Sequence, residues 1–366
     1  MTFNMQINAA AILFCFTLLC GQTLVAAEQV QNDKSILSAS GYLETYFLHD
    51  TNRPASEQRP SFAYSHTEID QASINLGFIK LKLDAENVRG NLALGSGTYM
   101  RANYAAEPQA LQKVLEANVG IKLANHLWLD AGVMPSHIGF ESAVGLDNWT
   151  LSRSILADNS PYFETGVKLS YTSEDGKWYA SGLLLNGWQR IQRANGNTTP
   201  SIGHQLTYKP NAKVTLNSSS FIGNNQSDND RRMRYFHNFY GQYQLNDQWG
   251  MIVGFDIGAE QATKNSSEYH VWLTPVVIAQ YIYSDKITLA ARAEYYQDKH
   301  GVIVSTDTPN GFRTFSTSAN IDYKVSNNFT LRAELRKFNS QDPIFQKRQG
   351  YSDESLNATT ALIMHF

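Results

Sequence analysis

One segment of the chain contains residue types that could act together as a nucleophile, a base and an orienting acid. Ser136, His137, Asp158 and Ser160 all lie in the segment 136–160. A serine hydroxyl becomes a nucleophile when an imidazole takes its proton and a carboxylate orients that imidazole. Such a set also arises by chance in a serine-rich chain, and Gly95-Ser96-Gly97 lacks the spacing of a nucleophile elbow. We therefore predict that the protein is not an enzyme, and we assign no catalytic residue.

The histidines and acidic residues do not form a recognisable metal site in the sequence. The nine histidines are scattered, and none is paired at the spacing of a catalytic zinc helix. Asp228 and Asp230 stand among asparagines, but the glycine and the terminal glutamate of a calcium-binding hand are missing. A solvated loop is the favoured interpretation of this cluster. We predict neither a metal ion nor a cofactor.

Charged residues occupy alternate positions in several apolar segments. Between Ile287 and Tyr295 the odd positions are apolar or aromatic, whereas Arg292 and Glu294 have the other parity. The segments 315–325 and 329–336 repeat this alternation. Successive side chains of a strand point to opposite faces, so each segment has one apolar and one polar face. The charged residues on these polar faces are Arg292, Glu294, Asp322, Lys324, Arg332, Glu334 and Arg336.

These segments belong to a long series of predicted strands, about sixteen in number within a range of about twelve to eighteen. Short turns such as Glu86-Asn87 and Ser326-Asn327 alternate along the series with longer loops. This alternation is typical of antiparallel up-and-down β-barrels in the bacterial outer membrane, which have short periplasmic turns and long extracellular loops. We also expect a short helix after Pro108, at 109–115. The predicted strands are 39–48, 70–84, 88–102, 115–123, 126–134, 161–173, 176–190, 201–209, 212–223, 234–246, 248–262, 269–284, 286–299, 311–325, 328–340 and 356–366.

The first 27 residues have the pattern of a secretory signal peptide. They contain no Lys, Arg, Asp or Glu, and an apolar run from Ala9 to Cys20 precedes a small-residue cleavage site. We predict cleavage between Ala27 and Glu28, which leaves a barrel at 28–366. The only two cysteines lie in this leader. Lipid attachment at Cys20 is an alternative that the bulky Leu19 disfavours.

The charge and hydropathy of the chain narrow its class of partner. The formal net charge is −3, which does not suggest a nucleic-acid partner. After the leader, the sequence has no apolar run of the roughly 18 residues that a membrane helix needs. We therefore expect outer-membrane lipid around a closed barrel. Arg231, Arg232 and Arg234 could contact lipopolysaccharide phosphates at the outer rim, although a solvated loop face is the favoured alternative.

The C-terminus carries a pattern that fits a closing strand. Leu356, Leu362, Met364 and the terminal Phe366 share one face of the last predicted strand. We interpret Phe366 as an assembly signal read by the barrel-assembly machinery. An even number of strands returns the C-terminus to the periplasmic side, where the N-terminus also lies.

The segment 136–160 is the longest predicted loop and the third long one. A third loop that folds into the barrel would narrow it, and its charges would then set ion preference. The alternative, that the loop packs on itself outside with Trp149 as its anchor, carries equal weight. The candidate constriction residues are Glu141, Asp147, Asn148, Trp149, Arg153, Asp158 and Asn159.

The chain also resembles outer-membrane porins of the beta-barrel porin-2, OmpL-like type. The resemblance is carried by Gly132-Val133-Met134-Pro135-Ser136-His137-Ile138-Gly139-Phe140-Glu141-Ser142, Asn148-Trp149-Thr150-Leu151-Ser152-Arg153-Ser154, Asp158-Asn159-Ser160-Pro161-Tyr162, Ser40-Gly41-Tyr42-Leu43-Glu44-Thr45-Tyr46 and Thr308-Pro309-Asn310-Gly311-Phe312. It covers nearly all of the chain after the leader. It implies a barrel with a pore, and it supplies neither a substrate nor catalytic residues.

Passive diffusion of small hydrophilic solutes through a water-filled barrel is the leading functional hypothesis. The seven charged residues on the polar faces would line the lumen, and their mixed signs argue against a pore for only anions or only cations. Alternatively, these charges pair across strands and plug the barrel. A closed structural barrel whose extracellular loops bind a partner is the second hypothesis, and a soluble secreted β-sandwich is the third. Assembly into a homo-oligomer stays open.

Overall fold

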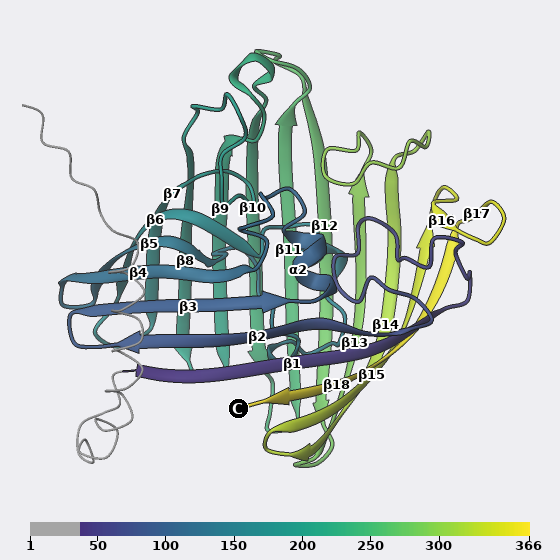
Figure 1. Cartoon of the computed structure of the whole chain (residues 1–366), viewed down its shortest axis with the longest axis horizontal. Coiled ribbons are helices and arrows are strands. Elements are labelled where there is room, and N and C mark those ends of the chain that lie inside the picture. The colour runs from purple at the N-terminus through teal and green to yellow at the C-terminus, as the bar shows by residue number, and fades with distance from the viewer. Residues whose placement is uncertain (1–36) are drawn as a thin grey trace, which may run out of the picture. The chain divides into compact units, whose positions relative to one another are not determined.

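The computed structural model describes residues 37–366, and these residues form one closed antiparallel barrel of sixteen strands. Each strand pairs with its neighbours in sequence, and β1 pairs with β18 to close the ring, as Figure 1 shows. The strands of the barrel are β1 Leu37–Asp50, β2 Ala72–Asp84, β3 Val88–Ser96, β4 Val114–Ala124, β5 Leu127–Pro135, β6 Phe163–Thr172, β7 Trp178–Leu185, β8 Ser201–Asn211, β9 Val214–Asn224, β10 Met233–Gln244, β11 Trp249–Gln261, β12 Tyr269–Ile282, β13 Ile287–Asp298, β14 Phe312–Ser326, β15 Phe329–Ser340 and β18 Glu354–His365.

Short helices and one small hairpin lie in the long loops. The hairpin is separate from the barrel and pairs Phe345 with Ser352. No helix among residues 37–366 is long and apolar enough to cross a membrane. The loop elements are α2 Thr98–Asn103, α3 Ile155–Asp158, the 3-10 turns η1 Gly145–Asp147 and η2 Asp228–Asp230, and the hairpin strands β16 Phe345–Gln346 and β17 Tyr351–Ser352.

The predicted fold class and all sixteen predicted strands are confirmed, with two strand ends corrected. The third strand ends at Ser96 instead of residue 102, because Gly97 adopts φ +129° and α2 follows. A Cβ at Gly97 would lie 2.3 Å from the carbonyl oxygen of Asn75, so this turn requires glycine. The seventh strand ends at Leu185 instead of residue 190. The expected helix at 109–115 is wrong, since turns lead there directly into β4.

The two faces of the barrel wall are inverted relative to a water-soluble sheet. On β13, Leu289 is exposed on the outside, whereas Arg292 and Glu294 are almost completely buried inside. The same arrangement holds on β14 and β15, where Phe315 and Leu335 face outward. An apolar outer band around a polar interior is what a bilayer requires of a barrel. The barrel is therefore a transmembrane barrel of the outer membrane.

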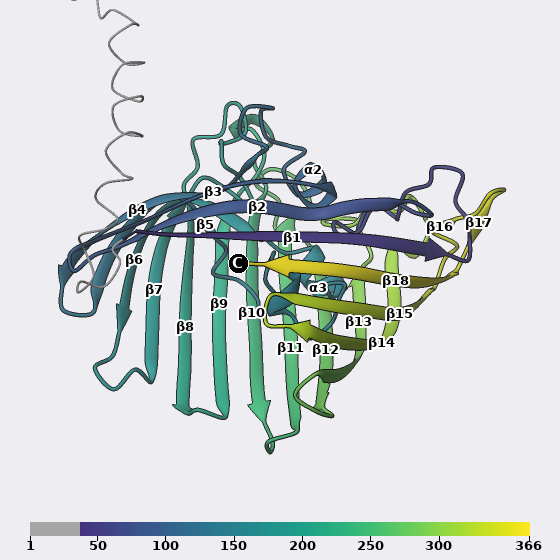
Figure 2. The same ribbon diagram turned by 60° about the horizontal axis from the view of Figure 1, so that its bottom comes forward.

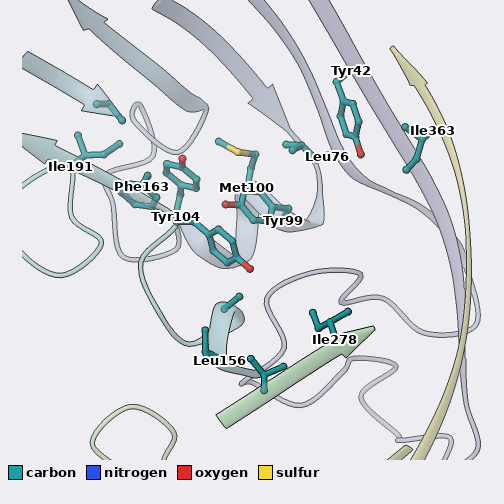
Figure 3. Close-up of a cluster of buried hydrophobic side chains, with 14 of the residues drawn as sticks. Tyr42, Leu76, Tyr99, Met100, Tyr104, Leu156, Phe163, Ile191, Ile278 and Ile363 are labelled. Carbon is teal, nitrogen blue, oxygen red and sulfur yellow. The ribbon is translucent and has the colours of Figure 1, made fainter. Parts of the chain in front are cut away.

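The apolar core lies inside the barrel, between the long loops and the inner wall. Figure 3 shows its main cluster, in which Tyr99 and Met100 of α2 and Leu156 of α3 meet inward side chains of several strands. The rings of Tyr104 and Phe163 stack with their centroids 4.1 Å apart. A second cluster forms around Phe62 of the first long loop, whose ring contacts Phe312, Phe338 and Phe345. The loops are therefore packed parts of the fold.

The two ends of the barrel sequence meet at the closing seam. Phe366 and Gly41 exchange two backbone hydrogen bonds of 2.9 Å and 3.1 Å beyond the register of β1 and β18. A Cβ at Gly41 would lie 2.3 Å from the Phe366 ring, so the glycine makes room for that ring. The predicted leader and its cleavage site lie outside the described residues.

Candidate functional site

The loop 136–162 crosses the interior of the barrel. It leaves β5, reaches the inner wall formed by β13, β14 and β15, and returns to β6, with α3 against β12 and β13 (Figure 2). Backbone N–H groups of the loop donate to wall side chains: Ser152 to Glu334 at 2.7 Å and Ile155 to Glu294 at 2.5 Å. The loop therefore lies inside the lumen and is fastened to the inner wall at β13 and β15.

Three wall arginines bind carbonyl groups of the same loop. Arg292 donates to the Ser152 carbonyl at 2.6 Å, and Arg336 donates to the Arg153 carbonyl at 2.8 Å. Arg332 donates to the carbonyls of Gly145 at 2.6 Å and Asn148 at 2.9 Å. A guanidinium has five N–H donors in a rigid plane, so each arginine can hold the loop and an acidic partner together.

The acidic partners of these arginines are on other strands of the same wall, and two of the three pairs join β13 and β15 across β14. Arg336 lies 2.6 Å from Glu294, Arg292 lies 3.0 Å from Glu334, and Arg332 binds Asp322 through two nitrogens at 2.6 Å and 2.9 Å. Arg292, Glu294, Arg332, Glu334 and Arg336 are at most 3% exposed. Charges this deeply buried are tolerated only when paired and hydrogen-bonded.

The seven predicted lumen residues are therefore placed in two different environments. Arg292, Glu294, Arg332, Glu334 and Arg336 face inward, but the loop covers them. Asp322 keeps a side-chain exposure of 20%, and Lys324 is exposed near the short-turn end of β14. The alternative in which charges pair across strands describes the arginines well.

The predicted constriction residues mostly hold the loop in shape. Asn148 exchanges hydrogen bonds with the backbone of Ser142 at 2.7 Å and 2.9 Å. The fully buried Arg153 donates to the carbonyls of Ser142 and Ala143 and lies over the rings of Tyr99 and Tyr162. These contacts are internal to the loop and its neighbours.

Trp149 lies against a part of the wall that has no side chain. A Cβ at Gly250 of β11 would meet the indole of Trp149 at 2.6 Å, so glycine makes room for the ring. The contact fits a loop anchored on the inner wall, which is the first of the two loop placements considered above.

Asp158 and Asn159 connect the loop 136–162 to the first long loop, 51–71. Asp158 accepts a hydrogen bond from Ser65 at 3.2 Å, and Asn159 donates to the Phe62 carbonyl at 3.1 Å. The loop 51–71 is thus fastened to the loop 136–162, which we call the inner loop. The Phe62 ring lies among aromatic residues of β14, β15 and β16.

Glu141 and Asp147 are the two predicted constriction residues that line an internal cavity. Glu141 accepts hydrogen bonds from the Ser154 N–H at 3.1 Å and from the Ser154 hydroxyl. Burial raises the pKa of the Glu141 carboxyl to about 7, against the opposing effect of the Arg292 charge. Asp147 is exposed within this cavity.

The open space in the barrel lies on the side opposite the arginines. One cavity of about 390 Å³ separates the loop from β2–β4 and includes Lys80, Glu116, Phe140 and Asp147 in its lining. A second cavity of about 440 Å³ continues along the inner wall of β2–β7, toward the short turns, and includes Arg89, Asn118, Asp130 and Lys168. The two cavities share Glu116 and Pro135, so they adjoin.

Ion pairs organise the wall beside these cavities. Lys80 lies 2.5 Å from Glu116 where the two cavities meet, and Arg89 binds Asp130 through two nitrogens at 2.6 Å and 2.7 Å. The Arg89 guanidinium also lies 4.3 Å above the Trp128 ring. Sequence reasoning missed these residues, although alternation in 70–84 and 115–123 places Lys80 and Glu116 on polar faces.

The serines, the histidine and the aspartate considered above as a possible catalytic set do not form one in the structure. His137 contacts Glu164 through Nδ1 at 2.7 Å and the Ser220 carbonyl through Nε2 at 2.8 Å, so neither ring nitrogen meets a serine hydroxyl. Asp158 binds Ser65 instead. In the part of the chain that the structure describes, no three His, Cys, Asp or Glu side chains are grouped to hold a metal ion.

The basic residues predicted for the outer rim do not share one surface. Arg234 is 6% exposed inside the barrel, where it binds Glu260 at 2.6 Å. Only Arg231 and Arg232 remain near the loop surface. Arg234 is therefore unsuited to contact lipopolysaccharide.

The barrel is similar in fold to several solved outer-membrane proteins. The anion-selective porin from Comamonas acidovorans superimposes with a TM-score of 0.60 at 9% identity, covering 90% of this chain and 99% of the porin. The outer membrane channel DcaP of Acinetobacter baumannii gives 0.59 at 10% identity, covering 90% and 97%. OmpT, an outer membrane protein of Vibrio cholerae, gives 0.59 at 10% identity, covering 92% and 100%. At such low identities these likenesses concern the fold.

No curated protein matches the sequence. The model of one protein family, described as "Putative beta-barrel porin-2, OmpL-like", matches residues 37–366, which is the whole of the barrel. The chain therefore belongs to the beta-barrel porin-2, OmpL-like family of outer-membrane proteins.

Proposed function

We propose that the protein is a porin-like channel through which small hydrophilic solutes diffuse between the loop 136–162 and the inner wall of β2–β7. The observation that carries this proposal is the pair of adjoining cavities of about 390 Å³ and 440 Å³, which share Glu116 and Pro135. The charged and amide side chains of Arg89, Asn91 and Lys168 line the second cavity and suit a hydrated solute. Family and fold are those of porins.

In this proposal, the part of the inner wall at β13 and β15 and the part at β2–β5 have different roles. The arginines of β13 and β15 hold the loop in place, and the ion pairs of β2–β5 face the solute. Lys80, Arg89 and Lys168 are balanced by Glu116 and Asp130 nearby. This mixture of signs supports weak ion selectivity.

Liposome swelling tests the proposal with the purified full-length protein. Proteoliposomes diluted into isotonic arabinose should swell, and swelling should slow as the sugar is enlarged from arabinose to stachyose. Empty liposomes provide the control. Proteoliposomes that remain as tight as empty ones toward every sugar would sink the proposal.

A closed barrel whose loops bind a partner is the second candidate, and one observation favours it. The loop 51–71 is fastened over the inner loop through Ser65, Asn159 and the buried Phe62. If this cover seals the mouth, the parent protein should give no swelling, whereas removal of residues 55–64 should make proteoliposomes permeable. Permeability in the parent protein argues against this candidate.

A further inference from the structure

Lys168 of β6 presents an unpaired positive charge to the second cavity, the one of about 440 Å³ along β2–β7. Val167 and Leu169 are exposed on the outer face of β6, so Lys168 between them points inward. Within residues 37–366, the Lys168 ammonium forms no hydrogen bond and no ion pair. The charge is therefore free to meet a solute.

The other lysine, arginine and acidic side chains in the lining of the second cavity are all paired. Each lies within 2.9 Å of a group of opposite charge. The three pairs are Lys82–Asp84, Arg89–Asp130 and Lys80–Glu116. Because each pair is neutral, the wall of the second cavity keeps one positive charge, and that charge is at Lys168.

The strand register explains why Lys168 has no partner. Asp130 of β5 is the register partner of Lys168, but its two carboxylate oxygens accept hydrogen bonds from Arg89 at 2.7 Å and 2.6 Å. Arg89 of β3 reaches Asp130 across β4, where Gly120 is the residue between them in the register. A Cβ at Gly120 would lie 2.3 Å from Oδ1 of Asp130, so a side chain there would displace the carboxylate. The glycine thus lets Arg89 bind the carboxylate that Lys168 would otherwise bind.

The charge of Lys168 favours a solute with one negative charge. Lys168 is half-buried, and charges at the wall of a protein cavity interact more strongly than charges in bulk water. A solute that carries one negative charge would neutralise the wall of the second cavity. A doubly charged phosphate would fit less well, because Asp130 and Glu116 lie in the same lining.

The remaining lining of the second cavity suits the hydrocarbon part of an organic solute. A volume of about 440 Å³ is far larger than a chloride ion needs. Apolar walls with a few polar groups are typical of sites for small organic molecules. The apolar and aromatic residues of this lining are Trp128, Met134, Pro135 and Tyr179.

We propose that the second cavity contains a subsite for a small organic monocarboxylate. The Lys168 ammonium binds the carboxylate through a charge-assisted hydrogen bond, and Trp128 and Tyr179 contact the hydrocarbon part. This inference rests on the proposed function, because it names the class of solute that pauses on the proposed path. A single ion pair in a hydrated cavity binds weakly, which allows the solute to leave again.

Isothermal titration calorimetry with the purified full-length protein in detergent tests the proposal, with benzoate as the probe. Benzoate should bind saturably after subtraction of its titration into detergent buffer alone. Benzamide has the same shape without the charge, and acetate has the charge without the ring, so both should bind more weakly. Absence of saturable benzoate binding, or equal affinities for benzoate and benzamide, would overturn the proposal.

Substitutions of Lys168 test its role directly. Lys168→Gln should weaken benzoate binding about tenfold, because it removes a hydrogen bond between charged groups. Lys168→Arg keeps the positive charge and should keep most of the affinity. Lys177→Gln, at an exposed short turn outside both cavities, is the matched control and should bind benzoate as the parent protein does. Unchanged benzoate binding in Lys168→Gln would show that Lys168 does not form the subsite.

Single-channel recording separates the subsite from the channel. Benzoate should lower the current of the parent protein saturably, at concentrations that match the calorimetric affinity. Current without benzoate binding contradicts only the subsite, whereas benzoate binding without current contradicts only the channel.

Discussion

Arg336 of β15 and Glu294 of β13 meet at 2.6 Å beneath the loop 136–162, and each also binds the backbone of that loop. The two strands are separated by β14, so this pair crosses one strand of the wall. The relationship joins the barrel wall to the loop that divides the lumen. Its loss should therefore affect both the stability of the barrel and the size of the open passage.

Arg336→Ala should loosen the loop and destabilise the barrel. Removal of the Arg336 guanidinium takes an ion-pair partner away from the buried Glu294 carboxylate. Breaking a buried ion pair in this way costs about 3–5 kcal/mol. The free energy of unfolding in urea, measured in detergent or liposomes, checks the stability. Lys337→Ala is the control, because its contact with Glu354 is exposed. Equal stability of the two variants would contradict the anchoring role of Arg336.

Charge reversal at the junction of the two cavities should change ion selectivity. Glu116→Lys removes a negative charge beside Lys80 and should shift the reversal potential in a KCl gradient toward chloride preference. Lys80→Glu should shift it in the opposite direction. Lys177→Glu, at an exposed short turn outside both cavities, is the control. Reversal potentials that do not change in either junction variant would show that the ions do not pass the junction of the two cavities.

Glu141→Gln should change how stability depends on pH. Burial raises the Glu141 pKa from 4.5 to about 7 in the folded protein. Between these values the unfolded chain releases a proton that the folded chain keeps, so this group makes stability fall as pH rises from about 4.5 to 7. The resulting loss in the free energy of unfolding is about 2 kcal/mol, after a reduction for the partial solvent access of the Glu141 carboxyl.

Unfolding free energies at pH 4.5 and pH 7.5 check this prediction. The parent protein should lose more stability across this range than Glu141→Gln, which does not titrate. Asp147→Asn, on the same loop but exposed, is the matched control and should behave like the parent. An identical pH dependence in parent and Glu141→Gln would refute the prediction.

Phe62→Ala should release the cover formed by the loop 51–71. The Phe62 ring is 5% exposed and packs against Phe312, Phe338 and Phe345, and truncating such a ring costs about 3–5 kcal/mol. The loop should then be cut faster by added protease in intact cells. Phe315→Ala is the control, because that ring faces outward on β14. Equal cleavage rates in Phe62→Ala and parent would show that the ring does not hold the cover.

The strands could be predicted because one face of each strand meets lipid and the other faces the polar interior, so apolar and polar residues alternate clearly in the sequence. Arg292, Glu294 and Leu289 show this, since their parity alone assigned each to the correct face of β13. The turn at Gly97 was missed because its need for a positive φ comes from the nearby Asn75 carbonyl, which sequence does not reveal. Local pattern therefore predicts strands better than their ends.

The path of the inner loop could not be derived from the sequence. Trp149 fits against Gly250, and Ser152 binds Glu334, but these partners are far apart along the chain. The inward charges were identified without knowing which of them the loop would cover. That choice depends on packing across the whole lumen, so Lys80 and Glu116 emerged as cavity residues only from the structure.

Thiol modification during single-channel recording tests the path of the solute most directly. The account predicts that Asn118→Cys, which lines the cavity along β2–β7, loses current in steps when a charged methanethiosulfonate reagent is added. Val119→Cys on the outer face and Ser318→Cys, at a buried position on β14, should keep their current. Block of Ser318→Cys with no effect on Asn118→Cys would contradict the account.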